Sequence, residues 1–188
     1  MEFDLQTRLG WLDANHTQQG RAVTVVETSK EGEATVHISA ANTLLAVKTT
    51  EKNALNYLRQ KAVADGTVCE FLADGTVILH LVECKKTVRE KSWKHIKKQF
   101  HGALLNAFAL CGLLNLQQIT AIRLYTAYQN DKLSAESSPN PSLIKMPVGS
   151  RQPSLARDWR SGSVNIIGYN FEHQKIVLDA DGMASLQL

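Results

Sequence analysis

The amino-acid sequence predicts an α/β (α+β) fold in which a central mixed β-sheet is flanked by helices. Several segments alternate apolar and polar side chains as strands do, and a long amphipathic segment with helical spacing lies between two of them. The hydrophobic content of 44% in 188 residues is enough for one core. We therefore expect a single domain over residues 1–188, with an additional β-hairpin at each end.

The N-terminal part of the chain contains both helix and strand signals. Residues 3–12 have the spacing of a short amphipathic helix. Residues 21–29 and 34–40 alternate on either side of the turn-forming segment KEGE, which predicts the first β-hairpin. Residues 49–63 carry apolar side chains at helical spacing after a threonine, and this pattern predicts a second helix.

The segment GTVCEFLADGTVILHLVECKK, residues 66–86, is the clearest hairpin signal. Two β-rich runs flank Asp74-Gly75, a dipeptide typical of two-residue turns. Residues 92–114 then form a broad apolar stripe at helical spacing, with Ser92 as the expected N-cap. Residues 118–128 follow as a strand, and a strand–helix–strand order of this kind favours a parallel pair.

The composition changes towards the C-terminus. All four prolines lie within residues 131–163, which we expect to form a long polar loop. The segments SVNIIGYNF and HQKIVLDADG then predict a closing hairpin within residues 164–188.

Composition and motifs exclude several classes of protein. Three cysteines without a CxxC or HxxxH pattern fit a reducing compartment and predict no zinc site. The N-terminus lacks the cationic start and apolar core of a signal peptide, and no run of apolar residues is long enough to cross a membrane, so a cytoplasmic protein is expected. No P-loop, GxGxxG or GxSxG motif is present.

The cationic side chains are concentrated directly after the central hairpin. Residues 85–98 contain seven lysines or arginines and one acid, although the whole chain has a net charge of only +3. Binding to nucleic-acid phosphates needs a surface of one sign. We therefore expect nucleic-acid contacts from Lys86, Lys94, Lys97 and Lys98, with a solvated helix face as the alternative.

An acid and a base end the apolar run Val77–Val82. Glu83 and Lys85 share one face of the strand because side chains alternate, whereas Cys84 points to the other face. With a second carboxylate, Glu83 could hold Mg²⁺, and Lys85 could orient a water or stabilise developing charge. The alternative is a solvated strand end whose ion pair contributes little to stability.

The second carboxylate has two candidates. If Asp74-Gly75 forms a two-residue turn, Glu70 and Glu83 share a face of the hairpin. Glu83 then lies about 13 Å along its strand beyond the residue directly across from Glu70. Asp65 is nearly opposite Glu83, but the same turn places it on the other face. Because Glu70 is on the same face as Glu83, Glu70 is the first candidate for the second carboxylate and Asp65 is the second. Glu70 needs a bulge or strong twist to reach Glu83.

The order of helix, hairpin, E-x-K, helix and strand over residues 50–130 resembles the core of the PD-(D/E)xK nuclease superfamily, which has the restriction-endonuclease-like fold. The match rests on Glu83-Cys84-Lys85 at the end of VILHLV. The segment VCEFL is similar to segments where members carry an aspartate, although Glu70 stands there in this chain. Gln99 resembles the helix glutamine that follows E-x-K in some branches.

The resemblance implies a metal-dependent nuclease that hydrolyses phosphodiester bonds in nucleic acid, with DNA as the expected substrate, in DNA processing or defence. Mg²⁺ or Mn²⁺ would be held by Glu83 with Glu70 or Asp65, and Lys85 would complete the catalytic group. The cationic helix and Gln99 would hold the substrate, and the chain would form a homodimer or join a larger complex. The alternative is a non-catalytic module of the same fold that binds nucleic acid or a protein partner through residues 131–163.

Overall fold

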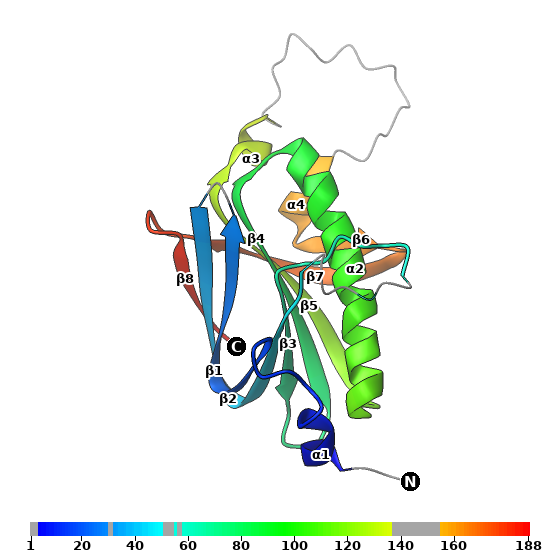
Figure 1. Cartoon of the computed structure of the whole chain (residues 1–188). Helices are drawn as coiled ribbons and strands as arrows, with labels where there is room; N and C mark the ends of the chain where they lie inside the picture. The colour runs from blue at the N-terminus through cyan, green and yellow to red at the C-terminus, as the bar shows by residue number, and fades with distance from the viewer. Residues whose placement is uncertain (1–3, 30–31, 51–54, 56–57, 137–154) are drawn as a thin grey trace.

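The computed structural model describes residues 4–29, 32–50, 55, 58–136 and 155–188 (Figure 1). Within them the elements in chain order are α1 (Leu5–Leu9), β1 (Thr17–Ser29), β2 (Gly32–Lys48), β3 (Gly66–Phe71), β4 (Val77–Val88), α2 (Glu90–Leu114), β5 (Ile119–Asp131), α3 (Lys132–Glu136), α4 (Leu155–Ser161), β6 (Ser163–Ile166), β7 (Tyr169–Val177) and β8 (Met183–Gln187).

The described strands form one mixed sheet in the order β1-β2-β3-β4-β5-β7-β6, with β8 beside β2. The strands from β1 to β4 are antiparallel neighbours, whereas β4, β5 and β7 run parallel. The sheet and its few flanking helices confirm the α+β class, and the parallel β4–β5 pair joined through α2 confirms the expected crossover. The strand β8, which pairs with β2 in parallel, was not predicted.

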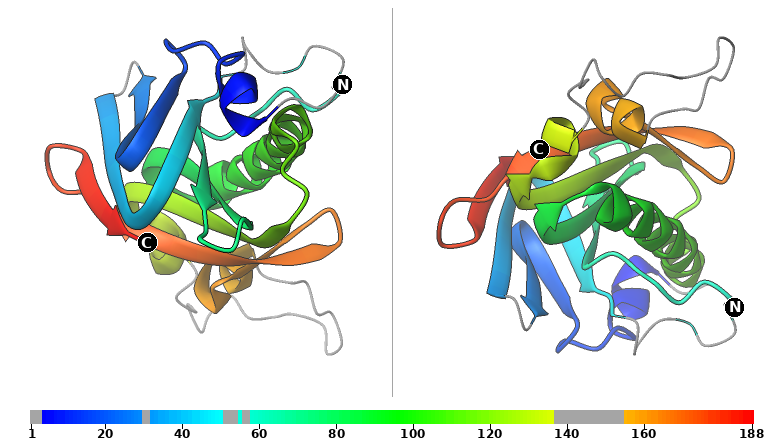
Figure 2. Two further views of the ribbon diagram at one scale, coloured as in Figure 1. Left: turned by 90° about the horizontal axis from the view of Figure 1, so that it is seen from below. Right: turned by 90° about the horizontal axis from the view of Figure 1, so that it is seen from above.

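Two apolar clusters lie on opposite faces of the central strands. The first lies under α2, which packs on β4 and β5 through Leu79, Leu81 and Leu124. The second joins the β1–β2 hairpin to the other face through Val25, Val68, Val82 and other side chains. Because β1 and β4 are not neighbours in the sheet, the sheet must curve for these side chains to share a core (Figure 2).

The helix predicted over residues 49–63 is absent from the part of this segment that the structure describes. Residues 58–63 form neither helix nor strand and lie along α2, where the Gln60 side-chain amide donates to Lys98 O (2.7 Å). Residues 51–54, 56 and 57 lie outside the described residues. Helical spacing is a weak prior for a short segment, and contacts with a neighbouring element readily override it.

Gly102 of α2 allows residues 58–63 to approach the helix closely. A Cβ at Gly102 would lie 1.9 Å from Ala62 O, a backbone atom that cannot move aside as the end of a flexible side chain could. We expect Gly102→Ala to lower the free energy of unfolding by about 3 kcal/mol in urea denaturation. Gly112→Ala in the same helix is the control, because a Cβ there meets nothing within 4 Å, and it should stabilise by up to about 1 kcal/mol. Equal effects of the two substitutions would contradict this packing.

Several predicted boundaries shift. The helix α2 begins at Glu90 after Arg89, so Ser92 is not the N-cap; its hydroxyl instead accepts a hydrogen bond from Arg89 N–H (2.7 Å). The C-terminal hairpin turns at Ile167 and Gly168, which both have positive φ, as a two-residue turn requires. The region expected to be a polar loop contains α3 and α4, and residues 137–154 lie outside the described chain.

Candidate carboxylate and lysine site

The loop of the β3–β4 hairpin decides which acids share a face of the sheet. The loop has three residues, 73–75, and is closed by Leu72 N–H, which donates to Thr76 O (2.9 Å). The Asp74 carboxylate accepts from Thr76 N–H (2.9 Å), and Gly75 has a φ of 83°. The predicted two-residue turn was therefore wrong by one residue, and a shift of one residue moves side chains to the opposite face.

The corrected register places Asp65 close to Glu83. The β3–β4 pairing ends at Gly66 and Val82, and Asp65 is the residue directly before β3. The negative charge of Asp65 contributes to the raised pKa of Glu83, so the two carboxylates lie near each other. Asp65 Oδ2 also accepts a hydrogen bond from Cys84 N–H at 2.8 Å. Asp65 is therefore the acid that the fold brings to Glu83.

Glu70 lies on the other face, which corrects its predicted position beside Glu83 as a catalytic and metal-binding residue. It pairs with Ile78 in the hairpin. Its Oε2 lies 3.1 Å from His80 Nε2, and its Oε1 accepts a hydrogen bond from Asn42 Nδ2 at 2.7 Å. The three-residue loop explains this correction, because it shifts the pairing by one residue and turns the Glu70 side chain to the face opposite Glu83. The contacts of Glu70 are those of a buried structural acid.

The Glu83 side chain is completely buried (0% exposed) and forms an ion pair with Lys85 Nζ. Within the described chain, Oε2 of Glu83 has no hydrogen-bond donor. Burial, followed by the negative charge of Asp65, raises the pKa of Glu83 well above its usual value. Glu83 is therefore not part of a solvated strand end, which removes that alternative.

Lys85 is the cation of this group, and its side chain is 21% exposed. Burial alone would lower the pKa of Lys85, but the Glu83 carboxylate outweighs burial, and the pKa is raised. Lys85 therefore stays protonated at neutral pH. Cys84, between the two charged residues, is buried on the opposite face, as predicted.

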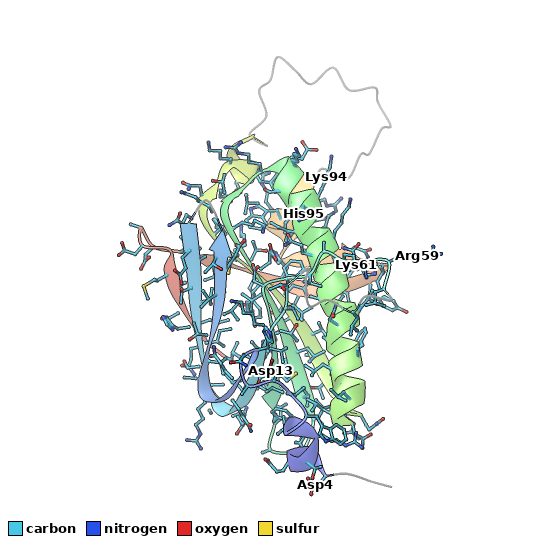
Figure 3. All side chains as sticks on the ribbon, in the orientation of Figure 1. Asp4, Asp13, Arg59, Lys61, Lys94 and His95 are labelled. Carbon is cyan, nitrogen blue, oxygen red and sulfur yellow. The ribbon has the colours of Figure 1, made fainter. Side chains whose placement is uncertain are left out.

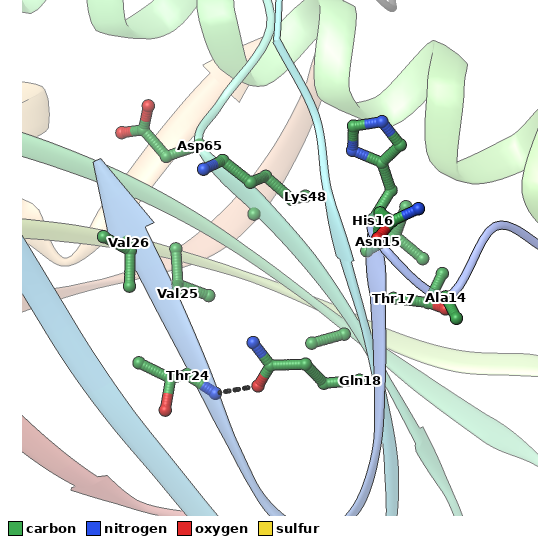
Figure 4. Close-up of a pocket in the computed structure, with 13 residues that line it drawn as sticks. Ala14, Asn15, His16, Thr17, Gln18, Thr24, Val25, Val26, Lys48 and Asp65 are labelled. Atoms are coloured by element: carbon green, nitrogen blue, oxygen red, sulfur yellow. Dashed lines mark hydrogen bonds between the residues drawn. The ribbon is translucent and has the colours of Figure 1, made fainter. Parts of the chain in front are cut away.

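Asp65 borders a pocket of about 230 Å³ between β1, β2 and the start of β3 (Figure 4). Burial, and then the charge of Glu27, raises the pKa of Asp65 to about 6. The hydrogen bond from Cys84 N–H and the charges of Lys85 and Lys48 act in the opposite direction. Figure 4 shows the Lys48 side chain extending towards Asp65 across this pocket.

Glu27 of β1 is a third acid near the site, and it was not predicted. Val25 packs directly on Gly66, because a Cβ at Gly66 would lie 2.5 Å from Val25 Cγ2. Glu27 is two residues further along β1 and so points to the same side of that strand. One signal could have revealed it, since Glu27 continues the buried apolar face of Val23 and Val25 with a charged residue.

An open pocket of about 420 Å³ lies where β4 leads into α2. Lys85 contributes to it, so its side chain connects the pocket to Glu83. None of the described residues that line the pocket is acidic. The lining residues are Lys85, Lys86, Thr87, Arg89, Lys91, Ser92 and His95. We call this the basic pocket.

The cationic helix side chains predicted to bind nucleic acid have different surroundings. Lys94 forms an ion pair with Glu90 (3.1 Å), and Lys97 forms one with Asp158 of α4 (2.9 Å). Lys98 is exposed.

Gln99 is buried beside residues 58–63, and its side-chain amide donates to Val63 O (3.3 Å). Of the five predicted contact residues, only Lys86 lines the basic pocket.

The carboxylates are compatible with a divalent metal ion. The described residues contain no group of three or more His, Cys, Asp or Glu side chains placed to hold a metal. Mg²⁺ is nevertheless commonly bound through one or two carboxylates, together with water and substrate phosphate oxygens. Glu83 is buried and Asp65 is half-buried, both have raised pKa values, and Glu83 Oε2 has no donor within the described chain. A cation would offset these unfavourable features.

No protein-family model, curated protein or solved structure matches the chain. Within the described residues, no helix is both long and apolar enough to cross a membrane. Function must therefore be argued from the chemistry of the site.

Proposed function

We propose that the protein is a metal-dependent nuclease with a restriction-endonuclease-like core, which hydrolyses phosphodiester bonds with DNA as the expected substrate. One observation carries the proposal: Asp65 lies near Glu83, where its Oδ2 accepts a hydrogen bond from Cys84 N–H, and Lys85 follows Glu83 by two residues in β4. Glu83 is buried, its Oε2 has no hydrogen-bond donor in the described chain, and a second acid, Asp65, lies near it. A metal-binding role accounts for these features better than a structural role does.

The order of elements gives additional support. The antiparallel β3–β4 hairpin is followed by α2 and by β5 parallel to β4, which is the order on which the family resemblance rests. The structure departs from that order in one respect: the helix expected before the hairpin is absent from the residues that the structure describes.

Asp65 and Glu83 would hold the Mg²⁺ or Mn²⁺ ion, which when bound supplies Lewis-acid polarisation and an activated water. Lys85 is protonated at neutral pH, so it donates hydrogen bonds and positive charge and does not act as the base. That charge stabilises the negative charge that develops on the phosphoryl oxygens. The basic pocket binds neighbouring phosphates and orients the strand.

The test is cleavage of DNA and RNA panels with Mg²⁺, Mn²⁺ or a chelator. We expect cleavage only with metal, and a loss of about 100-fold or more in Asp65→Asn. Glu70→Gln should retain cleavage, because Glu70 lies on the other face of the sheet. The site assignment is wrong if Glu70→Gln abolishes cleavage while Asp65→Asn does not. The function itself is rejected if the wild-type protein cleaves no nucleic acid with either metal.

A second candidate function is metal-independent binding of nucleic acid by a non-catalytic module. The complete burial of Glu83 favours it, because a metal ion and its water need access to the carboxylate. Titration calorimetry with Mg²⁺ or Mn²⁺ separates the two functions. The module predicts no metal heat and unchanged DNA affinity in Glu83→Ala, whereas the nuclease predicts a metal heat that Glu83→Ala removes.

A further inference from the structure

The basic pocket carries more positive charge than one backbone phosphate requires. Lys85 is already engaged by Glu83, but Arg89 and Lys91 are exposed, and no described acid forms an ion pair with either. The one acid of this helix turn, Glu90, pairs with Lys94 and is not part of the pocket lining.

The pocket is also a shaped site. It is concave, and its volume of about 420 Å³ lies within the range of small-molecule sites. The Ser92 hydroxyl is used internally, accepting from Arg89 N–H and donating to Arg89 O (3.0 Å), which fixes the first turn of α2. The N-terminal end of this 25-residue helix adds a positive dipole to the side-chain charges. Figure 3 shows His95 near this end of α2.

We propose that the basic pocket binds the terminal phosphate monoester of a nucleic-acid strand, so that cleavage occurs near phosphorylated ends. This inference rests on the proposed nuclease function. A monoester carries a charge of about −1.5 to −2 at neutral pH, whereas each backbone diester carries only one negative charge. Arg89 and Lys91, with the helix dipole, match the greater charge. Because Lys85 borders both the pocket and Glu83, a strand held by its end presents the adjacent backbone to Asp65 and Glu83.

The test is fluorescence anisotropy of the full chain in a chelator, which separates binding from cleavage. One oligonucleotide is prepared with a 5′-phosphate, with a 3′-phosphate, or with hydroxyls at both ends. We expect one phosphorylated form to bind about tenfold more tightly than the unphosphorylated form. The double variant Arg89→Gln/Lys91→Gln should lose this preference.

The matched control is Lys98→Gln/Arg21→Gln, which removes the same charge from exposed positions outside the pocket. It should weaken the binding of all three oligonucleotides equally and keep the preference. Equal wild-type affinity for the three forms, or loss of the preference in the control as well, would overturn the inference. Preference for a phosphorylated end without cleavage would reject the nuclease function and support terminal-phosphate binding by the basic pocket. Cleavage without the preference would support the nuclease function and reject terminal-phosphate binding.

Discussion

Glu83→Gln is expected to abolish metal-dependent cleavage and, at neutral pH, to stabilise the fold. The loss of cleavage should be about 100-fold or more, because the substitution removes a charged metal ligand. The gain in stability should be on the order of 1–3 kcal/mol, because glutamine avoids the cost of a buried carboxylate whose pKa is raised. Loss of activity together with a gain in stability is the result expected for a catalytic residue whose presence destabilises the fold.

The two members of the ion pair should respond in opposite directions. Lys85 is partly exposed and can turn towards water when Glu83 is replaced, so its loss of a partner costs little. Glu83 has no such route when Lys85→Met removes its counter-charge. We expect Lys85→Met to destabilise the fold by about 1–3 kcal/mol.

Chemical denaturation of both variants, measured without metal, tests this asymmetry. A purely structural ion pair predicts the opposite sign for Glu83→Gln, namely destabilisation, because breaking a buried pair exposes the full desolvation cost. A destabilised Glu83→Gln variant that still cleaves DNA would therefore remove Glu83 from the proposed site.

Much of the fold could be predicted because it depends on local periodicity. A period of two places Glu83 and Lys85 on one face of β4 and Cys84 on the other, and this needs no knowledge of the neighbouring strands. The apolar stripe of α2 likewise predicts which side of the helix is buried.

The acid that lies near Glu83 could not be predicted, because it depends on the length of one loop. The dipeptide Asp74-Gly75 suits a two-residue turn and also the three-residue loop that forms, in which Gly75 takes the positive φ. A difference of one residue in loop length brings Asp65, and not Glu70, near Glu83. The position of Glu27 depends on the curvature of the whole sheet, which local patterns do not encode.

Nor could the sequence distinguish cations that bind a ligand from cations that are already paired. Lys97 meets Asp158 only because α4 packs beside α2, far from it along the chain. The cationic segment of residues 85–98 therefore predicts a charged surface, but it does not show which of these cations line the basic pocket at the β4–α2 junction.

The stability of the metal-free protein is expected to fall as the pH rises from about 4 to about 6, because of Asp65. Its pKa is about 6 in the folded protein and 3.8 ordinarily. Below pH 4 both states are protonated, and Asp65 contributes nothing. Between these values the unfolded chain releases its proton more readily and is favoured. The cost should be about 2 kcal/mol, less than the roughly 3 kcal/mol of the full shift, because the side chain keeps some exposure.

A divalent metal ion should reverse this trend, because it binds the ionised carboxylates that the apoprotein disfavours. Mg²⁺ or Mn²⁺ should raise the melting temperature at neutral pH and have little effect below about pH 5, where protons compete for Asp65 and Glu83. Thermal unfolding across this pH range, with and without metal, measures both effects. Asp65→Asn should lessen the fall in stability between about pH 4 and 6 and weaken the metal effect, whereas Asp181→Asn, at an exposed position, should change neither. A metal effect that persists below about pH 5, or survives Asp65→Asn in full, would place the ion away from these carboxylates.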